Sequence, residues 1–288
     1  MSSTLTLPPA PFPQSLTLSL TLLILSESSA FYLGSALFKT LASLSFFLGG
    51  LDIGGSIIYQ LPFDWTTICY EERYRYTLFM ILGLGFSVLG DVFLIPSRDT
   101  YYSFRRPLPG SKQTTPVKGE GDSLWFKAGT FFFALAHISY TVAFASNPSR
   151  TPFHWTAFGL ASVFGLGLSK WLGILGGSSP SSPTQLEIPN DMANLVKAYV
   201  CIITTMVGTA TATDPNQQKI LGAWMFMISD LFVAVDVFGK KKSPPASGYP
   251  HSYSGRNKRS SGSRPGWPFR SVGWIFYFGA NLILAGSI

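Results

Sequence analysis

The chain contains few of the side chains on which most metal and nucleophilic sites depend. Its 288 residues include two cysteines and three histidines, and only 12% of the residues are charged. Cys69 falls in a predicted loop and Cys201 in an apolar segment, so neither a disulfide nor a metal-ligand spacing is expected. The sequence also shows no nucleophilic triad. We therefore expect no metal and no other cofactor.

Apolar residues, by contrast, form long uninterrupted segments. The chain is 47% hydrophobic, a composition typical of proteins that cross a membrane several times. Since about 20 apolar residues span the hydrocarbon, we predict an all-α membrane protein with a bundle of about eight transmembrane helices. The domain 15–288 follows a short exoplasmic tail, 1–14. The predicted spans are Ser15–Leu33, Thr40–Tyr59, Thr77–Ile95, Leu124–Ser146, Phe153–Leu175, Ala193–Thr213, Ile220–Phe238 and Val272–Ile288.

The basic residues fall almost entirely on one side of this predicted bundle. When the connections are assigned alternately to two sides, one side receives only Arg73, Arg75, Arg150 and Lys219. The positive-inside rule then places the other side, with connections 96–122 and 239–269, in the cytoplasm, and both termini opposite. We expect these two connections to be disordered. The placement of the charges behind the net charge of +7 thus indicates the orientation in the membrane rather than nucleic-acid binding. As the location we expect an endomembrane, such as the endoplasmic reticulum.

Two carboxylates interrupt the apolar segments. Asp91 lies in LGLGFSVLGDVFLI and Asp230 in LGAWMFMISDLFVAV. An ionisable group at the centre of a span costs about 2.5–3.5 kcal/mol on insertion scales, faces the protein interior and marks a functional site. Glu27 and Asp52, in the first two segments, have no evident role.

Other polar residues share helical faces with these aspartates. Ser87 and Asp91 are spaced i, i+4, as are Tyr277 and Asn281, while His137 and Tyr140 share a face of the fourth segment. From the helical rise, we expect Asp91, His137, Tyr199 and Asp230 to lie between the cytoplasmic surface and the middle of the membrane. Four helices would then surround one cavity that opens to the cytosol.

The segments that carry these residues resemble a known family. FSVLGDVFLI, FKAGTFFFALAHISY, VKAYVCIITTM, GAWMFMISDLFVAVDVF and WIFYFGANLILAGS resemble, in order, the characteristic segments of the YhhN-like membrane proteins, the lysoplasmalogenase family. The resemblance implies hydrolysis of the vinyl ether bond of a lysophospholipid, a 1-alkenyl-glycerophosphoethanolamine or -choline, to a fatty aldehyde and a glycerophospho-base. It further implies that Asp91 and Asp230 are catalytic. Where the family usually has Gln in the last span, this chain has Asn281.

The residue types suit that reaction. Protonation of the alkene gives an oxocarbenium ion, which water captures, and the resulting hemiacetal collapses to aldehyde and alcohol. This requires an acid that is still protonated near neutral pH, and desolvation or a second carboxylate keeps a proton on a carboxyl group. A second, ionised carboxylate would stabilise the cation or accept a proton from water. Which of the two aspartates is the acid stays open.

Around the aspartates we expect substrate contacts from His137, Tyr140, Lys197, Tyr199, Tyr277, Asn281 and Ser87. For each of them a structural role is the alternative. Ser87 and Asn281 are residue types that often join helices, and Lys197 would either extend to the cytoplasmic surface or pair with a substrate phosphate.

Two other functions fit the same residues. Intramembrane carboxylates also relay protons in transporters, and a proton-driven uptake assay would identify such a function. A lipid-binding protein without turnover would bind lipid tightly and release no product. The expected partners are a lysophospholipid and the surrounding membrane lipids, while the oligomeric state is left undetermined.

Overall fold

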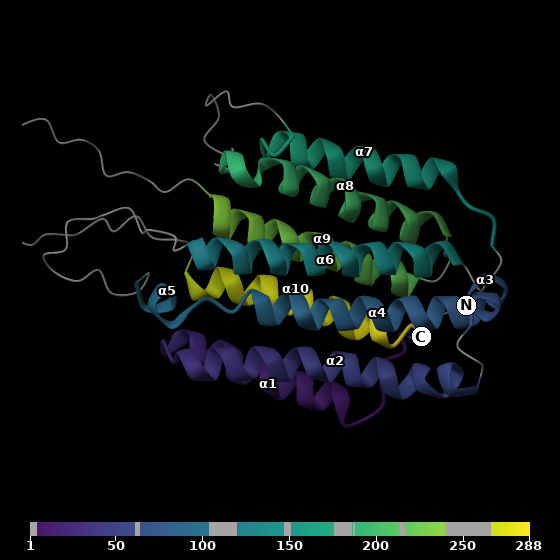
Figure 1. Ribbon diagram of the computed structural model, residues 1–288, viewed down its shortest axis with the longest axis horizontal. Coiled ribbons are helices and arrows are strands. Elements are labelled where there is room, and N and C mark those ends of the chain that lie inside the picture. The colour runs from purple at the N-terminus through teal and green to yellow at the C-terminus, as the bar shows by residue number, and fades with distance from the viewer. Residues whose placement is uncertain are drawn as a thin grey trace, which may run out of the picture.

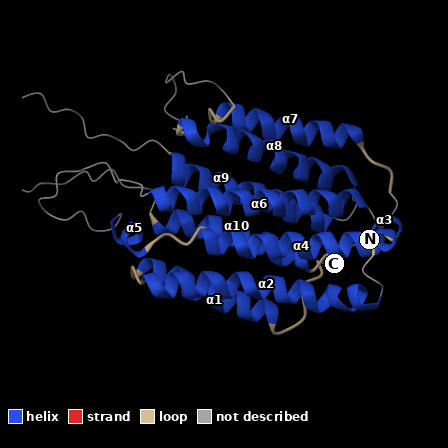
Figure 2. Cartoon of the chain, in the orientation of Figure 1, coloured by secondary structure: helices blue, strands red, loops and turns tan. Residues whose placement is uncertain are grey.

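Helices make up all the regular secondary structure that is described. The computed structural model describes residues 5–60, 64–103, 120–146, 151–175, 186, 188–213, 217–239 and 266–288, and no strand occurs among them (Figure 2). The helices are α1 (Phe12–Ser28), α2 (Tyr32–Gln60), α3 (Trp65–Tyr70), α4 (Glu72–Phe93), α5 (Arg98–Ser103), α6 (Glu120–Ser146), α7 (Trp155–Trp171), α8 (Asn190–Thr213), α9 (Gln217–Phe238) and α10 (Trp267–Ala285).

The long helices run side by side along one axis (Figure 1). Five of those described, α2, α4, α6, α8 and α9, are long and apolar enough to cross a membrane. This supports a multi-pass membrane protein but does not confirm the predicted eight spans. The helices α1 and α7, with 17 residues each, lie at the lower limit of the about 17–25 residues of transmembrane helices.

The observed helix boundaries differ from the prediction in a way that matters for the site. A turn containing Ala30, whose φ of 59° lies in the left-handed region, separates α1 from α2, so α2 begins at Tyr32 rather than at residue 40. At the other end of the chain, α10 begins at Trp267 rather than at residue 272, with Pro268 in its first turn, where proline's fixed φ suits a helix start.

Parts of the segments expected to be disordered loops are helical. Residues 98–103 of the predicted loop 96–122 form α5, and Tyr101 of this helix is buried. The Tyr101 hydroxyl lies 3.3 Å from Ser35 Oγ on α2, which docks the short helix on the bundle. Residues 104–119 and 240–265 of the two predicted loops lie outside the described part of the chain.

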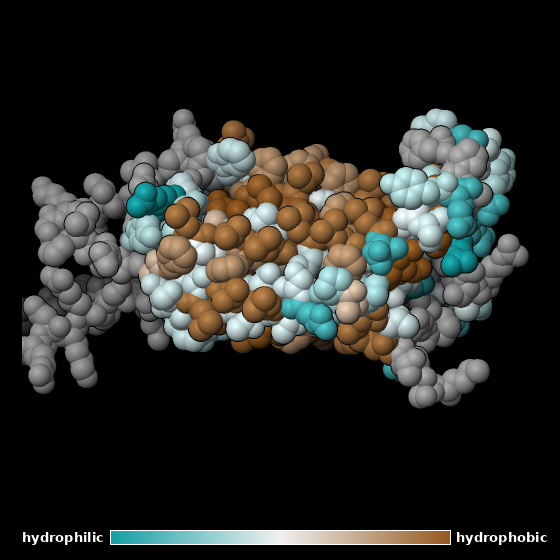
Figure 3. All heavy atoms as spheres, turned by 90° about the horizontal axis from the view of Figure 1, so that it is seen from below, coloured by the Kyte–Doolittle hydropathy of each residue, from teal (hydrophilic) through white to brown (hydrophobic). Residues whose placement is uncertain are grey.

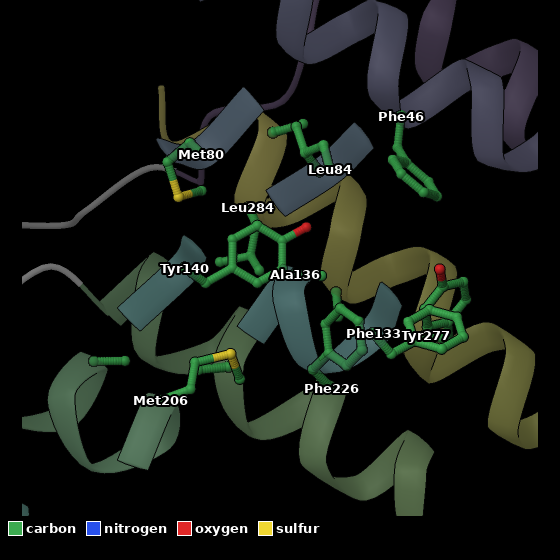
Figure 4. Packing of buried hydrophobic residues seen from close by; sticks show 14 of the residues in the cluster. Phe46, Met80, Leu84, Phe133, Ala136, Tyr140, Met206, Phe226, Tyr277 and Leu284 are labelled. Atoms are coloured by element: carbon green, nitrogen blue, oxygen red, sulfur yellow. The ribbon is translucent and has the colours of Figure 1, made fainter. Parts of the chain in front are cut away.

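The bundle packs together helices that are consecutive in the chain and helices that are distant in it. α1 packs on α2, α2 on α4 and α10, α4 on α6, α10 on α9, and α8 contacts α6, α7 and α9. Apolar side chains fill the space between them, and Figure 4 shows Phe133, Phe226 and Tyr277 gathered there. On the outer face in Figure 3, hydrophobic residues cover most of the middle, and hydrophilic residues gather toward the ends.

The C-terminus and the first described residues lie at the same end of the bundle (Figure 1). Thr6 donates its backbone N–H to Gln218 Oε1 at 3.0 Å and its hydroxyl to the Gly286 carbonyl oxygen at 2.7 Å. The opposite end holds the C-terminus of α9 and the N-terminus of α10 (Figure 1). The candidate site described next lies toward this second end.

Candidate functional site

One cavity of about 200 Å³ opens among the helices, and both intramembrane aspartates line it. Asp91 comes from α4 and Asp230 from α9. Most of the remaining lining is apolar and comes from α6, α7, α8, α9 and α10, with residues such as Phe133, Leu168 and Ile203. Two carboxylates from different helices therefore share a mainly hydrophobic chamber.

Asp91 is nearly inaccessible, and three hydrogen-bond donors surround its carboxylate. Ser43 donates to Oδ2 at 2.6 Å and Tyr277 donates to the same oxygen at 2.7 Å. The Lys39 ammonium lies 3.3 Å from Oδ1 and also donates to the Asp91 main-chain carbonyl at 3.2 Å. Of these partners only Lys39 carries a charge, and its ammonium group favours an ionised Asp91, whereas the Ser43 and Tyr277 hydroxyls can each donate or accept.

Asp230 has a different environment. Its side chain is 21% exposed, and Tyr199 donates to Oδ2 at 2.6 Å. His137 Nε2 lies 2.8 Å from the Tyr199 hydroxyl and 3.4 Å from Asp230 Oδ2. His137 Nε2 is therefore within hydrogen-bond distance of both groups, while the buried Nδ1 has no hydrogen-bond partner in the described structure.

A single aromatic ring separates the two polar groups. The Phe226 ring centroid lies 4.6 Å from that of His137 and 5.2 Å from that of Tyr277, in edge-to-face contact with both. Phe133 packs edge-to-face on the other side of Tyr277 at 5.7 Å. The two phenylalanine rings therefore pack against Tyr277, which binds Asp91, and Phe226 also packs against His137, which lies beside Tyr199 and Asp230. Figure 4 shows Phe133, Phe226 and Tyr277 together.

Three of the predicted substrate contacts lie behind the cavity wall. Ser87, Tyr140 and Asn281 are fully buried, and none of them lines the cavity. The Tyr140 hydroxyl donates to Asn281 Oδ1 at 2.9 Å and lies 3.3 Å from Ser87 Oγ, while Asn281 Nδ2 donates to the Tyr277 carbonyl oxygen at 3.1 Å. The three residues join α4, α6 and α10 and fix the backbone of Tyr277.

The remaining predicted residues divide between the cavity and the surface. Tyr199 and Tyr277 line the cavity, and His137 is fully buried behind Tyr199. Lys197 is exposed and is not among the residues that line the cavity. Of the two unexplained acidic residues, Glu27 is buried beside Arg270, whereas Asp52 is exposed.

Sequence reasoning missed several members of the site. Lys39 and Ser43 bind Asp91, and Arg270 and Asp236 line the cavity at the end where α10 begins. The i, i+4 spacing of Lys39 and Ser43 in an apolar segment was a usable signal for a polar helix face. Among the described residues, no three His, Cys, Asp or Glu side chains are grouped closely enough to hold a metal ion.

The match to a known family covers the residues that form the site. Residues 34–288 match the YhhN family, a span that includes Lys39, both aspartates and all the other residues that line the cavity. The chain belongs to the YhhN family. The match begins within α2, so α1 lies before the matched residues. No curated protein and no solved structure matches the chain.

Proposed function

We propose that this YhhN protein is an intramembrane hydrolase that cleaves the vinyl ether bond of lysoplasmalogens. One observation carries the proposal: Asp91 and Asp230, from different helices, line the same mainly apolar cavity. Acid-catalysed vinyl ether hydrolysis needs a proton donor and an anionic group beside the developing cation, and this pair can supply both. Membership of the YhhN family is consistent with a hydrolase.

Asp91 takes the role of the ionised carboxylate. Its oxygens face Lys39, Ser43 and Tyr277, which all donate toward it. A fixed negative charge of this kind, already oriented before the reaction, stabilises an oxocarbenium ion without further rearrangement. The same carboxylate can accept a proton from the attacking water.

Asp230 takes the role of the acid. It lines the cavity, is more exposed than Asp91, and its Oδ2 accepts from Tyr199. That leaves Oδ1 as the atom that carries and delivers the proton. His137, hydrogen-bonded to Tyr199, holds the tyrosine hydroxyl in place.

The proposed hydrolysis accounts for every proton that is transferred and for one water molecule. Asp230 gives its proton to the alkene carbon that is not bonded to oxygen, and the other alkene carbon becomes the oxocarbenium centre. Water adds there while a proton passes to a carboxylate, which yields a hemiacetal. Return of that proton to the ether oxygen breaks the carbon–oxygen bond, and loss of the hemiacetal hydroxyl proton restores Asp230. One water is consumed, and an aldehyde and a glycerophospho-base are formed.

An amphiphilic substrate suits the lining of the cavity. The apolar residues from α7, α8 and α9, such as Leu168 and Ile203, would contact the alkenyl chain, and the polar end near α10 would contact the head group. In keeping with the charge pattern of the sequence, this polar end would face the cytosol.

The test is incubation of the detergent-purified protein with a panel of lysolipids, followed by mass spectrometry of the products. Release of a fatty aldehyde from 1-alkenyl lipids, with no release from 1-alkyl or 1-acyl analogues, is the expected result. Lipid binding without any product would instead indicate a non-catalytic lipid-binding protein. Proton-driven solute uptake without hydrolysis would indicate a transporter.

A further inference from the structure

Arg270 lies at the polar end of the cavity and was not part of the predicted site. It is in the first turn of α10, whose first residue is Trp267, and it lines the same cavity as Asp91. Tyr277, which binds Asp91, lies seven residues further along the helix. Seven residues are two turns, so the two side chains share a face and are about 10 Å apart along the axis.

The guanidinium group is only partly engaged. Nη1 lies 3.4 Å from Glu27 Oε2, and the Glu27 side chain is 5% exposed. Nε of Arg270 is buried and has no hydrogen-bond partner in the described structure. Arginine presents several N–H donors in a planar fork that matches the oxygens of a phosphate group. A donor that is buried without a partner costs free energy, which a bound oxyanion would recover.

The other cations near the site are unsuited to this role. Lys39 also lines the cavity, but its ammonium group is held by Asp91 Oδ1 and by the Asp91 carbonyl oxygen. Lys197, which the sequence offered as a phosphate partner, is exposed and does not line the cavity. Among the described lining residues, Arg270 is thus the cation that has a buried donor without a hydrogen-bond partner.

The charge around Arg270 limits which phosphate can bind. Glu27 and Asp236 are close to this end of the cavity, so a doubly charged phosphate monoester would be repelled more strongly than a singly charged phosphodiester. A head group that also carries an ammonium, such as phosphoethanolamine or phosphocholine, complements this mixture of charges. Glu27 meanwhile keeps the guanidinium group in position at the mouth of the cavity.

We propose that Arg270 binds the phosphodiester of a lysophospholipid whose vinyl ether lies deeper in the cavity, beside Asp91 and Asp230. The inference rests on the proposed function for the identity of the lipid. It makes Arg270 a determinant of head-group specificity that does not take part in the proton transfers. The two-turn spacing between Arg270 and Tyr277 sets the separation between the phosphate and the bond to be cleaved.

Binding of uncleavable saturated ethers tests this independently of catalysis. The full chain in detergent would be titrated with 1-O-alkyl-glycerophosphoethanolamine and with 1-O-alkylglycerol, which has the same chain and no phosphate. We expect Arg270→Gln to weaken binding of the phospholipid by about 10- to 100-fold, the equivalent of one charge-assisted hydrogen bond. Binding of the phosphate-free ether should stay within about twofold of wild type.

Two further variants separate recognition from folding. Arg270→Gln leaves buried Glu27 without this partner, so the double variant Glu27→Gln/Arg270→Gln removes both charges together, and it should show the same selective loss. Arg270→Lys keeps the charge without the fork, and we expect intermediate binding.

Several results would overturn the inference. One is an equal loss of affinity for both ethers in the Arg270→Gln and double variants, and another is no difference from wild type. If Arg270→Gln abolished only the binding of inorganic phosphate and left phospholipid binding unchanged, the site would serve a free anion rather than a head group. Absence of vinyl ether hydrolysis with the selective binding loss intact would count against the proposed function and leave the head-group site standing.

Discussion

The ammonium group of Lys39 binds both the side chain and the main-chain carbonyl of Asp91. The ammonium nitrogen lies 3.3 Å from Asp91 Oδ1 and 3.2 Å from the Asp91 carbonyl oxygen. It joins α2 to α4 close to the end of α4, where the last helical carbonyls lack intrahelical partners. One cation thereby compensates the charge of the carboxylate and completes the hydrogen bonding of the helix end.

Replacement of Lys39 by Met should strongly destabilise the protein, because it leaves the Asp91 charge buried without its cation. Breaking a buried pair on one side typically costs about 3–5 kcal/mol. Thermal unfolding in detergent would show a lower Tm for Lys39→Met, and Lys39→Met/Asp91→Asn should recover part of the loss. A Tm for the single variant equal to that of wild type would mean that the pair contributes little.

Replacing single tyrosines by phenylalanine should distinguish the tyrosines that act in the site from one that only supports the fold. Tyr199→Phe and Tyr277→Phe each remove a donor to a carboxylate, and we expect kcat to fall by about 10- to 100-fold, the equivalent of one charge-assisted hydrogen bond.

Tyr140→Phe is the matched control, because this hydroxyl binds Asn281 and Ser87 and reaches neither aspartate directly. The control should lose about 1 kcal/mol of stability and keep its activity per folded molecule. A Tyr140→Phe variant as inactive as Tyr277→Phe would place Tyr140 in the reaction.

The close approach of α4 and α6 depends on Gly83. A Cβ at this position would overlap the ring of Tyr140, which is fully buried. We expect Gly83→Ala to cost about 1–3 kcal/mol of stability through overpacking. Gly159→Ala on α7 is the control, since a Cβ there meets nothing within 4 Å, and it should gain up to about 1 kcal/mol from helix propensity. Equal unfolding temperatures for the two variants would contradict the packing argument.

One physical constraint explains how much of the site could be predicted from the sequence. A carboxylate within a membrane span needs polar partners in the protein interior. The sequence alone was therefore sufficient to predict that Asp91 and Asp230 share a cavity. Tyr199 followed from its expected depth in the membrane, and Tyr277 from the helical face that it shares with Asn281. The all-helical architecture likewise follows from the long apolar segments, whereas the number of full crossings depends on helix lengths, such as those of α1 and α7, that composition alone does not determine.

The missed residues share one cause, the positions of helix ends. The predicted span Thr40–Tyr59 begins just after Lys39, but α2 begins at Tyr32 and carries Lys39 inside the bundle. The predicted last span, Val272–Ile288, begins after Arg270, yet α10 begins at Trp267 and includes it. The turn at Ala30 and the helix start at Pro268 are local features that hydropathy does not register, and they decide which cations reach the cavity.

We expect that substitution of Lys197 does not affect the binding of the substrate head group. Because it is exposed and does not line the cavity, Lys197→Gln should leave KM for a phospholipid substrate within about twofold of wild type, as expected for a surface substitution. A KM that rose for phosphate-bearing substrates and stayed constant for phosphate-free ones would return the head-group role to Lys197.

The central claim is that two carboxylates in one apolar cavity perform the proton transfers. The most direct measurement is aldehyde release from a 1-alkenyl lysophospholipid by purified Asp91→Asn and Asp230→Asn, which keep the side-chain shape and remove the acid. We predict that each variant remains folded, as judged by its circular dichroism and elution in detergent, and loses at least about 100-fold in kcat. Aldehyde release at the wild-type rate from either folded variant would contradict the mechanism.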